Sequence, residues 1–344
     1  MSTHMFDEIK TYFSKNKIPT YRLKQLEDAV FKQSLLSFEQ ITTYPKNLRN
    51  ELDTKFSLTS LSLIEVEELE DSSKFLLKTH DEKYIEVVLM KHGDGRRTVC
   101  VSCQVFCPLN CSFCATGANS FERDLSCDEI VEQVLFVNSS LKECDERVTN
   151  VVFMGMGEPF LNYENVICAL KILNNEQCLN IGARHLTVST AGIVPRIYEF
   201  SDLGMQVRLA ISLHAPNDVL RSELMPINTK YPLEELLSAT DEFSKKTNKR
   251  VSFEYVLIKD VNDSLECAKQ LAYLMKNRLS HVNLLVYNPH EFCDFESPNK
   301  KTVMNFKKIL DKHGVECSIR KSLGGEISGA CGQLSGKKKS GDVP

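Results

Sequence analysis

Several features are missing from this 344-residue sequence, and each absence narrows its class. No apolar run approaches the length of a membrane span, and the N-terminal stretch MSTHMFDEIKTYF has charged residues where a signal peptide has an apolar core. We therefore expect a soluble, cytoplasmic protein with no membrane partner. No G-x-G-x-x-G motif follows the first strand of the predicted core, which argues against a Rossmann dinucleotide site. The sequence also has no internal repeat and no long low-complexity region.

Cysteine, by contrast, is abundant, with 13 residues. In a chain of this size without a secretion signal, clustered cysteines indicate metal or redox chemistry rather than a disulfide scaffold. Others, such as Cys168 and Cys267, occur singly in helix-like segments, where we expect small core residues or incidental thiols. Five cysteines fall in one short stretch: Cys100, Cys103, Cys107, Cys111 and Cys114.

The net charge of -4 conceals an asymmetry. Residues 300–344 contain ten Lys or Arg and four Asp or Glu, so this segment carries +6 and the rest of the chain carries -10. A basic segment could contact phosphates. Charge alone favours the simpler interpretation of a solvated helix face followed by a tail with Lys337, Lys338 and Lys339.

The first part of the chain predicts a small accessory domain, residues 1–95. Residues 26–41 and 45–56 have apolar positions at helical spacing. Residues 61–90 change character, with three short strand-like runs separated by polar turns. We therefore expect helices followed by a few strands.

Residues 96–334 have a different sequence pattern, in which strand-like runs alternate with helix-like segments. This alternation predicts a parallel sheet with crossover helices, and parallel strands are typically apolar throughout. The fold class we expect is α/β, an open or partial (β/α)6 barrel, followed by a basic flexible tail over residues 335–344. The six strand-like runs are TVCVSCQV, NVVFM, HLTVS, VRLAIS, VSFEYVL and HVNLLVY.

The densest chemistry is a C-x3-C-x2-C motif just after the first core strand, formed by Cys107, Cys111 and Cys114. Three thiolates on one tight loop can hold three corners of a [4Fe–4S] cluster and leave the fourth iron open to a ligand. The alternative is a zinc site in which Cys103 supplies a fourth sulfur. Zinc motifs usually contain two separated C-x2-C pairs, and the sequence has no second pair.

Polar or glycine-rich clusters follow several predicted strands. In (β/α) barrels functional groups collect where the strands end, so these clusters would converge on one mouth. Glycines there would let the backbone approach a ligand closely, Glu158 could pair with an ammonium group, and the hydroxyl and amide side chains could bond ribose or adenine. Each motif alone is weak, and an isolated His214 would more often be a structural histidine. The clusters are Gly155–Pro159, Ser189–Gly192, Ser212–His214 and Asn288–Pro289.

Together these segments resemble the RlmN/Cfr family of radical S-adenosylmethionine (SAM) RNA methyltransferases. The resemblance covers about residues 21–334 and rests on CVSCQVFCPLNCSFC, FMGMGEP, the STAG segment, AISLHAPND, MPIN, YNP and ACGQL. It implies that SAM binds the open iron and is cleaved to a 5′-deoxyadenosyl radical, so the cofactors would be a [4Fe–4S] cluster and SAM. It also implies SAM binding by Gly157, Glu158, Ser189, Ser212, Leu213, His214 and Asn288.

The resemblance implies two further cysteines and a base. An aromatic C–H carbon of adenine is not a nucleophile, so simple attack on the methyl group of SAM cannot work. In the family a protein thiol, matched here by Cys331, first takes a methyl group, and the carbon radical then formed on it adds to the ring. Glu86 would remove the ring proton, and Cys100 would attack the sulfur of Cys331 to release the product and leave a disulfide. Outside the family match, Cys331 would be a free loop thiol and Glu86 a solvent-facing strand residue.

The function implied by the resemblance is methylation of an adenosine of 23S ribosomal RNA, with the accessory domain 1–95 contacting RNA and a reducing donor such as flavodoxin supplying electrons. RlmN-type enzymes methylate C2 and some also act on transfer RNA, whereas Cfr-type enzymes methylate C8 and confer antibiotic resistance. GMGEP and AISLHAPND are RlmN-like, while FCATG and YRLKQLEDAVFKQ are Cfr-like; we favour C2. The rivals are a radical SAM enzyme with a non-RNA substrate and a non-catalytic metal-containing RNA-binding protein.

Two positions depart from the family pattern, Cys103 where relatives tend to have serine and Phe106 where glycine is common. Neither removes a required group, although Cys103 could compete in disulfide exchange. Arg96 and Arg97 lie close to Cys100 in the sequence, where they could meet phosphates.

Overall fold

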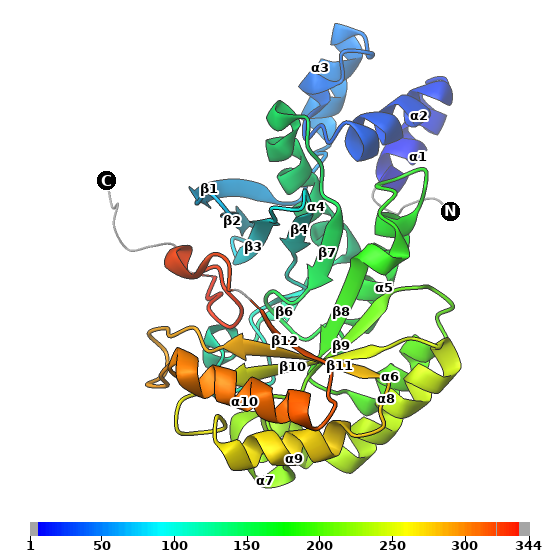
Figure 1. Ribbon diagram of the computed structural model, residues 1–344. Helices are drawn as coiled ribbons and strands as arrows, with labels where there is room; N and C mark the ends of the chain where they lie inside the picture. Colours follow the sequence, from blue (N-terminus) through cyan, green and yellow to red (C-terminus); the bar gives the residue numbers. More distant parts are fainter. Residues whose placement is uncertain (1–5, 321, 337–344) are drawn as a thin grey trace.

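The computed structural model describes residues 6–320 and 322–336, and in them a single sheet of ten strands organises the fold (Figure 1). The strands lie in the sheet in the order in which they occur in the chain. The first four are paired antiparallel, and from the fourth to the last each neighbouring pair is parallel. They are β1 (Ser62–Glu68), β2 (Ser72–Lys78), β3 (Tyr84–Lys91), β4 (Arg97–Cys100), β7 (Asn150–Phe153), β8 (Leu186–Thr190), β9 (Arg208–Ser212), β10 (Val251–Leu257), β11 (Ser280–Val286) and β12 (Cys317–Arg320).

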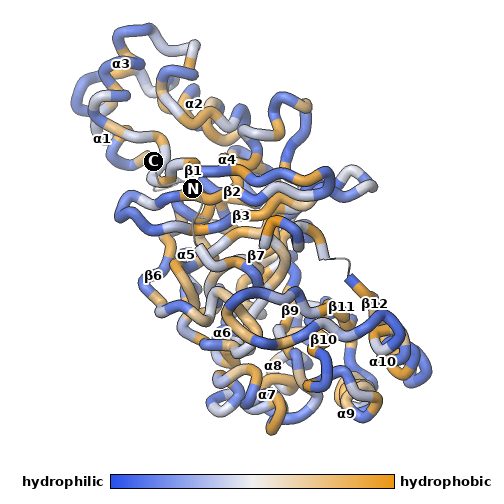
Figure 2. The backbone as a smooth tube through the Cα atoms, turned by 90° about the vertical axis from the view of Figure 1, so that its left-hand side faces the viewer, coloured by the Kyte–Doolittle hydropathy of each residue, from blue (hydrophilic) through white to orange (hydrophobic). Residues whose placement is uncertain are grey.

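The parallel strands are connected by helices, as the alternating pattern predicts. A separate two-stranded ribbon joins β5 (Gln104–Val105) to β6 (Arg123–Asp124). Hydrophobic residues concentrate along the strands and the helix faces that cover them (Figure 2). The crossover helices are α4 (Cys127–Leu141), α5 (Tyr163–Asn174), α6 (Val194–Ser201), α7 (Asp218–Leu224), α8 (Leu233–Thr247), α9 (Leu265–Met275) and α10 (Lys300–Lys312).

The sheet confirms the α/β class but has one parallel strand more than the six that the sequence predicts. Residues 300–344 read as a helix face followed by a tail, and α10 agrees with the helix. The chain then returns to the sheet as β12, pairing with β11. Every residue of β12 is only partly buried, so this edge strand has no continuous apolar run that the sequence could reveal. Lys337, Lys338 and Lys339 lie outside the described residues.

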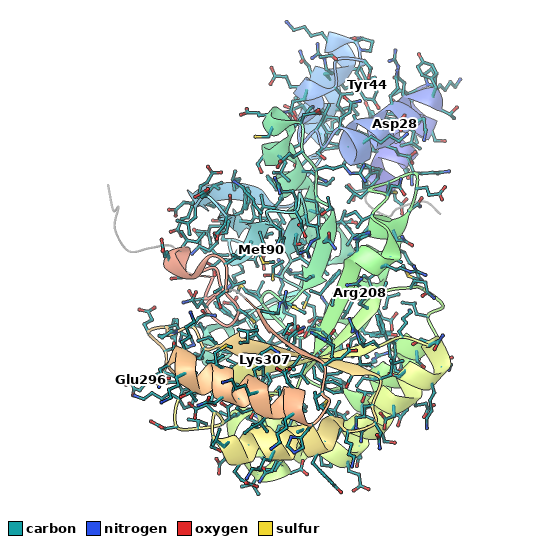
Figure 3. The ribbon with its side chains drawn as sticks, in the orientation of Figure 1. Asp28, Tyr44, Met90, Arg208, Glu296 and Lys307 are labelled. Carbon is teal, nitrogen blue, oxygen red and sulfur yellow. A yellow bond between two sulfur atoms is a disulfide. The ribbon has the colours of Figure 1, made fainter. Side chains whose placement is uncertain are left out.

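The accessory region contains the expected helices and strands. The helices α1 (Asp7–Lys15), α2 (Tyr21–Glu27) and α3 (Lys46–Lys55) lie at one end of the molecule, where Figure 3 labels Asp28 and Tyr44. Because β3 pairs with β4, the sheet is continuous across the predicted boundary between residues 95 and 96.

The expected helix over residues 26–41 is interrupted. After α2 the chain forms a single π-helical segment (Asp28–Lys32) and breaks at Ser34, whose φ is +50°. A new 3-10 turn (Phe38–Gln40) begins at Ser37, whose side chain and that of Gln40 form a capping box. The local capping groups therefore override the apolar periodicity.

One disulfide contradicts the interpretation of Cys168 as a core residue or incidental thiol. Cys127, the first residue of α4, is bonded to Cys168 of α5, with their Cα atoms 5.7 Å apart. The two helices pack against each other, which places both cysteines at one helix–helix contact. No helix in the described part of the chain is long and apolar enough to cross a membrane.

Candidate active site

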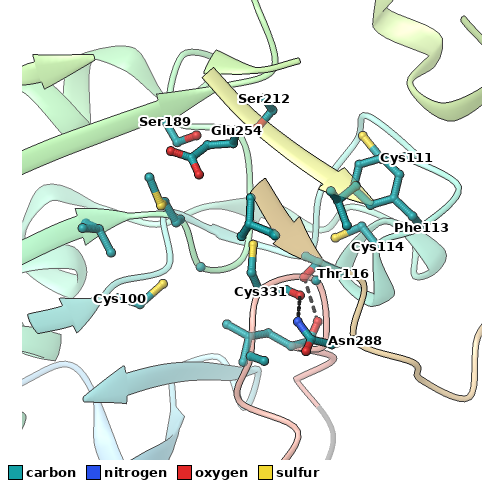
Figure 4. Close-up of a pocket in the computed structure, with 18 of the residues that line it drawn as sticks. Cys100, Cys111, Phe113, Cys114, Thr116, Ser189, Ser212, Glu254, Asn288 and Cys331 are labelled. Atoms are coloured by element: carbon teal, nitrogen blue, oxygen red, sulfur yellow. Dashed lines mark hydrogen bonds between the residues drawn. The ribbon is translucent and has the colours of Figure 1, made fainter. Parts of the chain in front are cut away.

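A cavity of about 210 Å³ lies at the ends of the parallel strands and is covered by the C-terminal segment, residues 322–336 (Figure 4). Most of the residues singled out from the sequence line it, although they come from different strands and loops. Leu213 and Glu86 are not in the lining; Leu213 is buried in the core. The predicted residues that line the cavity are Cys100, Cys107, Cys111, Cys114, Gly157, Glu158, Ser189, Ser212, His214, Asn288 and Cys331.

The loop with the C-x3-C-x2-C motif brings three free thiols to this cavity. Burial raises the pKa of Cys107 to about 12 and that of Cys111 well above its usual range, so these thiols need a strongly electropositive partner to ionise. Cys103 packs in the core, is 2% exposed and does not line the cavity. The donor set therefore fits three thiolate ligands from one loop rather than a site of four cysteines.

Within residues 6–320 and 322–336, no three His, Cys, Asp or Glu side chains are placed to hold one metal ion. The cysteines of a [4Fe–4S] cluster bind different irons, so they need not converge on one point.

The loop after β7 presents Gly157 and Glu158 to the cavity. Gly157 has φ +101°, and a Cβ there would stand 2.5 Å from the Cβ of Gln104, so only glycine fits. The Gln104 side-chain oxygen accepts a hydrogen bond from the Glu158 amide at 2.8 Å. The Glu158 carboxylate in turn accepts from the amides of Phe160 and Ala191 at 2.9 and 2.7 Å, which fixes it in the cavity wall. Burial raises the pKa of this carboxyl group.

His214 is held as a neutral imidazole. Its Nδ1 accepts a hydrogen bond from the Val256 amide at 3.0 Å, so the ring proton lies on Nε2. Burial lowers the pKa of His214 to about 3, and its ring meets the edge of Phe113 from the cysteine loop. The residue can therefore donate a hydrogen bond into the cavity but cannot carry a charge there at neutral pH.

Arg221 is a structural centre of the site that the sequence analysis did not identify. Its side chain is fully buried, and burial lowers its pKa to about 10. The guanidinium donates to the carbonyl oxygens of Ala191 and Ser212 at 2.6 and 3.1 Å, tying together the loops after β8 and β9. Asn228, from the MPIN segment, accepts from the same guanidinium at 2.8 Å. The MPIN segment signalled the partner Asn228, but no signal in the sequence pointed to Arg221 itself.

The C-terminal segment is fastened to the cysteine loop on one side. The Ala115 amide donates to the Gly332 carbonyl at 2.8 Å, and the Thr116 hydroxyl donates to the Leu334 carbonyl at 2.7 Å. These contacts hold Cys331 over the cavity that Cys100 also lines (Figure 4). Burial and the neighbouring Cys331 raise the pKa of Cys100 to about 12. The fold thus brings together two cysteines from β4 and from near the end of the chain.

Glu86 lies on β3 beneath the same segment. One carboxylate oxygen, Oε2, accepts from the amides of Ser335 and Gly336 at 2.7 and 2.9 Å. The other, Oε1, is 3.1 Å from the ammonium of Lys74. Glu86 is therefore buried and not solvent-facing, and residues 335 and 336, expected as the start of a flexible tail, pack against it.

Two charged groups in the cavity wall were also missed. Glu254 of β10 is buried and accepts a hydrogen bond from Asn283 at 2.8 Å, and burial raises the pKa of its carboxyl group. Arg320 of β12 lies 3.5 Å from Glu254. An acidic residue inside the apolar run VSFEYVL was the available signal for Glu254.

Arg96 and Arg97, expected to meet phosphates near the active site, are engaged elsewhere. Arg97 forms a two-pronged ion pair with Glu146, and Arg96 pairs with Asp94. Neither lines the cavity. Adjacency in the sequence to Cys100 was misleading because Arg97 stands three positions before Cys100 on β4, so their side chains lie on opposite faces, and Arg96 precedes the strand.

Comparison with known proteins agrees with this architecture. The model of the radical SAM superfamily matches residues 101–271. A crystal structure of a radical SAM methyltransferase from Sphaerobacter thermophilus is 42% identical, with a TM-score of 0.92 over 96% of this chain and 97% of that chain. Fold and site together define a radical SAM enzyme.

Two curated relatives identify the group within that superfamily. The first, from Bacillus licheniformis, is 44% identical over 97% of this chain and 92% of its own length. The second, from Dictyoglomus thermophilum, is 44% identical over 95% of this chain and 94% of its own length. Both are named probable dual-specificity RNA methyltransferase RlmN. The chain belongs to the RlmN family of radical SAM methyltransferases.

Proposed function

We propose that this protein transfers a methyl group from SAM to C2 of an adenosine in 23S ribosomal RNA, with transfer RNA as a second substrate. The observation that carries the proposal is the convergence of Cys100, Cys331 and the three motif cysteines on one cavity. A radical SAM enzyme with a small-molecule or peptide substrate would have no need of the first two thiols. The relatives' printed name, with its RNA substrate and dual specificity, supports the same function.

In this proposal Cys107, Cys111 and Cys114 hold a [4Fe–4S] cluster, and the cavity wall binds SAM. When bound, these cofactors supply a methyl group and a carbon-centred radical. Glu158, which lines the cavity, would accept a hydrogen bond from the ammonium group of SAM, and the neutral His214 would donate one from Nε2. The proposed set is completed by Gly157, Ser189, Ser212, Leu213 and Asn288.

The protein's own residues carry out the remaining steps. Cys331 is the methyl carrier, and its position over the cavity allows it to reach both the cofactor and an entering base. The adduct formed by radical addition must also give up one electron, for which the bound cluster would be the acceptor. Glu86 takes the proton from the adenine carbon, whose C–H electron pair restores the aromatic ring. The sulfur of Cys100 then bonds to that of Cys331 as the S–C bond breaks. The electron pair of that bond stays with the product carbon, which takes up the proton that the Cys100 thiol loses and becomes the methyl group.

We further propose that the accessory region 1–95 and the basic C-terminal residues contact RNA, and that a cytoplasmic reductant such as flavodoxin supplies electrons. Phosphate contacts would make RNA affinity fall steeply as salt rises. An affinity for an RNA fragment that is constant between low and high salt would contradict the first part.

The decisive experiment is mass spectrometry of the ribosomal RNA adenosine from cells with and without the gene. We expect 2-methyladenosine only with the gene, and none when the gene encodes Cys331→Ala. A product methylated at C8 would replace the proposal with the Cfr-type reaction. Unmodified RNA, from cells in which the protein carries its cluster and cleaves SAM, would point to a non-RNA substrate.

A further inference from the structure

A charge triad, in which Lys74 and Glu86 are buried and Glu67 is partly exposed, lies beside the site on strands outside the parallel part of the sheet. Lys74 of β2 is 6% exposed, and its ammonium lies 2.9 Å from Glu67 of β1 and 3.1 Å from Glu86 of β3. Glu67 stands directly opposite Lys74 in the strand pairing. Glu86 is 2% exposed, so its interaction with Lys74 is almost completely shielded from water.

Stability alone does not account for this triad. Removing charges from water costs several kcal/mol per ion, and replacing a buried ion pair with apolar residues of similar size is often neutral or stabilising. Leu76 and Leu77 on the same strand are buried without charge, so an apolar residue would suit β2 at position 74. A lysine at this position is therefore better explained by its interaction with the carboxylates of Glu67 and Glu86.

The triad is adjacent to the cavity. Side chains alternate along a strand, so Glu86 shares a face of β3 with Val88 and Met90, and both of these line the cavity. The Ser102 hydroxyl donates to the Glu86 carbonyl at 2.7 Å, which fixes this part of β3 against the start of the cysteine loop. The Glu86 carboxylate therefore lies one strand position beyond the cavity wall, under the C-terminal segment.

The two oxygens of Glu86 have different partners. Oε1 faces Lys74, whereas Oε2 accepts from the backbone amides of Ser335 and Gly336. Gly336 is required for this approach, because a Cβ there would stand 2.9 Å from the Tyr84 carbonyl oxygen. For Oε2 to accept a proton from a substrate, it must first lose these two amides, whereas Oε1 can keep its ammonium partner. Oε2 is then an unoccupied proton acceptor.

We propose that Lys74 is a positioning residue for Glu86: its ammonium holds Oε1 and thereby turns Oε2 toward the C-terminal segment and the substrate. The inference rests on the proposed function of Glu86 as the base. In the step concerned, a proton moves from the adenine carbon to Oε2, and Lys74 neither gains nor loses a proton. Burial lowers the pKa of Lys74, but the charges and hydrogen bonds of Glu86 and Glu67 outweigh it and raise the pKa overall, so the ammonium persists.

The test compares Lys74→Met with Glu86→Ala, using cluster-loaded protein, SAM and an RNA fragment. The groups facing the Glu86 carboxylate are Lys74, with Glu67 behind it, and the two amides, while Cys100 is the titratable group of the next strand. Without its cation, a buried carboxyl group has a raised pKa and takes up a proton at neutral pH. Each pKa unit of this increase lowers the ionised fraction, and with it the rate of proton removal, about tenfold. Lys74→Met should therefore accumulate a covalent protein–RNA species at neutral pH, seen on denaturing gels before and after ribonuclease.

Raising the pH separates positioning from a merely structural role. In Lys74→Met the carboxyl group ionises again as pH rises, so the covalent species should disappear, whereas in Glu86→Ala it should persist. Lys74→Arg, which keeps the charge, should resolve the species faster than Lys74→Met. A covalent species in Lys74→Met that is unchanged by alkaline pH would overturn the inference.

A second measurement does not depend on turnover. The free energy of unfolding of Lys74→Met should rise as pH falls, because its buried carboxyl group is favoured when protonated, and this dependence should vanish in Lys74→Met/Glu86→Gln. Should Lys74→Met not fold, Glu67→Met/Lys74→Met, which carries one buried charge, is expected to show the same pH-dependent resolution. If Glu86→Ala gives free methylated RNA at the normal rate, the base assignment fails. If Glu86→Ala crosslinks while Lys74→Met does not at any pH, only the role of Lys74 fails.

Discussion

Cys100, at the end of β4, and Cys331, on the C-terminal segment, line the same cavity although they lie far apart in the sequence. The arrangement depends on the hydrogen bonds that fasten Gly332 and Leu334 to the cysteine loop. Two thiols that share a cavity can exchange a covalent partner, which is what the proposed reaction needs for release of its product.

Replacing Cys331 and replacing Cys100 should block different steps of the reaction. Cys331→Ala has no thiol to carry the methyl group and should never become attached to RNA. Cys100→Ala can form the adduct but lacks the thiol that resolves it, so it should accumulate a species joined through Cys331. Denaturing gel electrophoresis with and without ribonuclease measures both. Free methylated RNA from Cys100→Ala at the normal rate would refute the two-cysteine mechanism, and crosslinking by Cys331→Ala would reverse the roles.

The motif cysteines and Cys103 should differ sharply in their effect on iron content. Cys111 lines the cavity with the other motif thiols, whereas Cys103 is buried in the core. After anaerobic reconstitution, Cys111→Ala should lose the cluster absorbance and all SAM cleavage, while Cys103→Ala should keep both. Full iron content in Cys111→Ala, or its loss in Cys103→Ala, would contradict the assignment of the ligands.

Gly157→Ala should weaken SAM binding more than an alanine replacement at another glycine that also has a positive φ. A side chain at this positive φ costs about 1–2 kcal/mol, and the added Cβ would also overlap Gln104. Gly95 has φ +87° but open space around it, so Gly95→Ala is the matched control. We expect SAM affinity to fall more than about tenfold in Gly157→Ala and to stay unchanged in Gly95→Ala, as measured by equilibrium binding. Equal effects would show that the close approach to Gln104 is unimportant.

Glu132 should make stability depend on pH. This buried residue of α4 accepts hydrogen bonds from the Ser60 and Leu61 amides, and burial raises its pKa from 4.5 to about 7. The folded protein thus holds this proton up to about pH 7, whereas the unfolded chain releases it near 4.5. The resulting contribution, about 3 kcal/mol, is fully present below pH 4.5 and is lost as pH rises through 7.

Chemical denaturation across this pH range checks that expectation. Glu132→Gln keeps one side-chain oxygen for the amides, so it should flatten the slope and be more stable than the unmodified protein at alkaline pH. Glu143→Gln, at an exposed position, is the control and should leave the slope unchanged. An unaltered slope in Glu132→Gln would mean that another group causes it.

The sequence by itself determined the class of the fold and most of the candidate site. The apolar strands between β4 and β11 are recognisable because a buried parallel strand needs a continuous apolar run, and the motif cysteines because their spacing is local. Residues at strand ends such as Glu158 and His214 could be grouped in advance, since the carboxyl ends of parallel strands meet at one edge.

The tertiary structure decided what depends on pairing between distant segments. The edge strand β12 and the buried Arg221 have no local signal, because one is defined by its partner strand and the other by carbonyl groups from separate loops. Sequence adjacency suggested Arg97 for the active site, but its guanidinium pairs with Glu146. The role of Lys74 could not be predicted from the sequence, because a lysine on a strand is ordinarily solvated. Only the pairing of β1, β2 and β3 brings two carboxylates next to it.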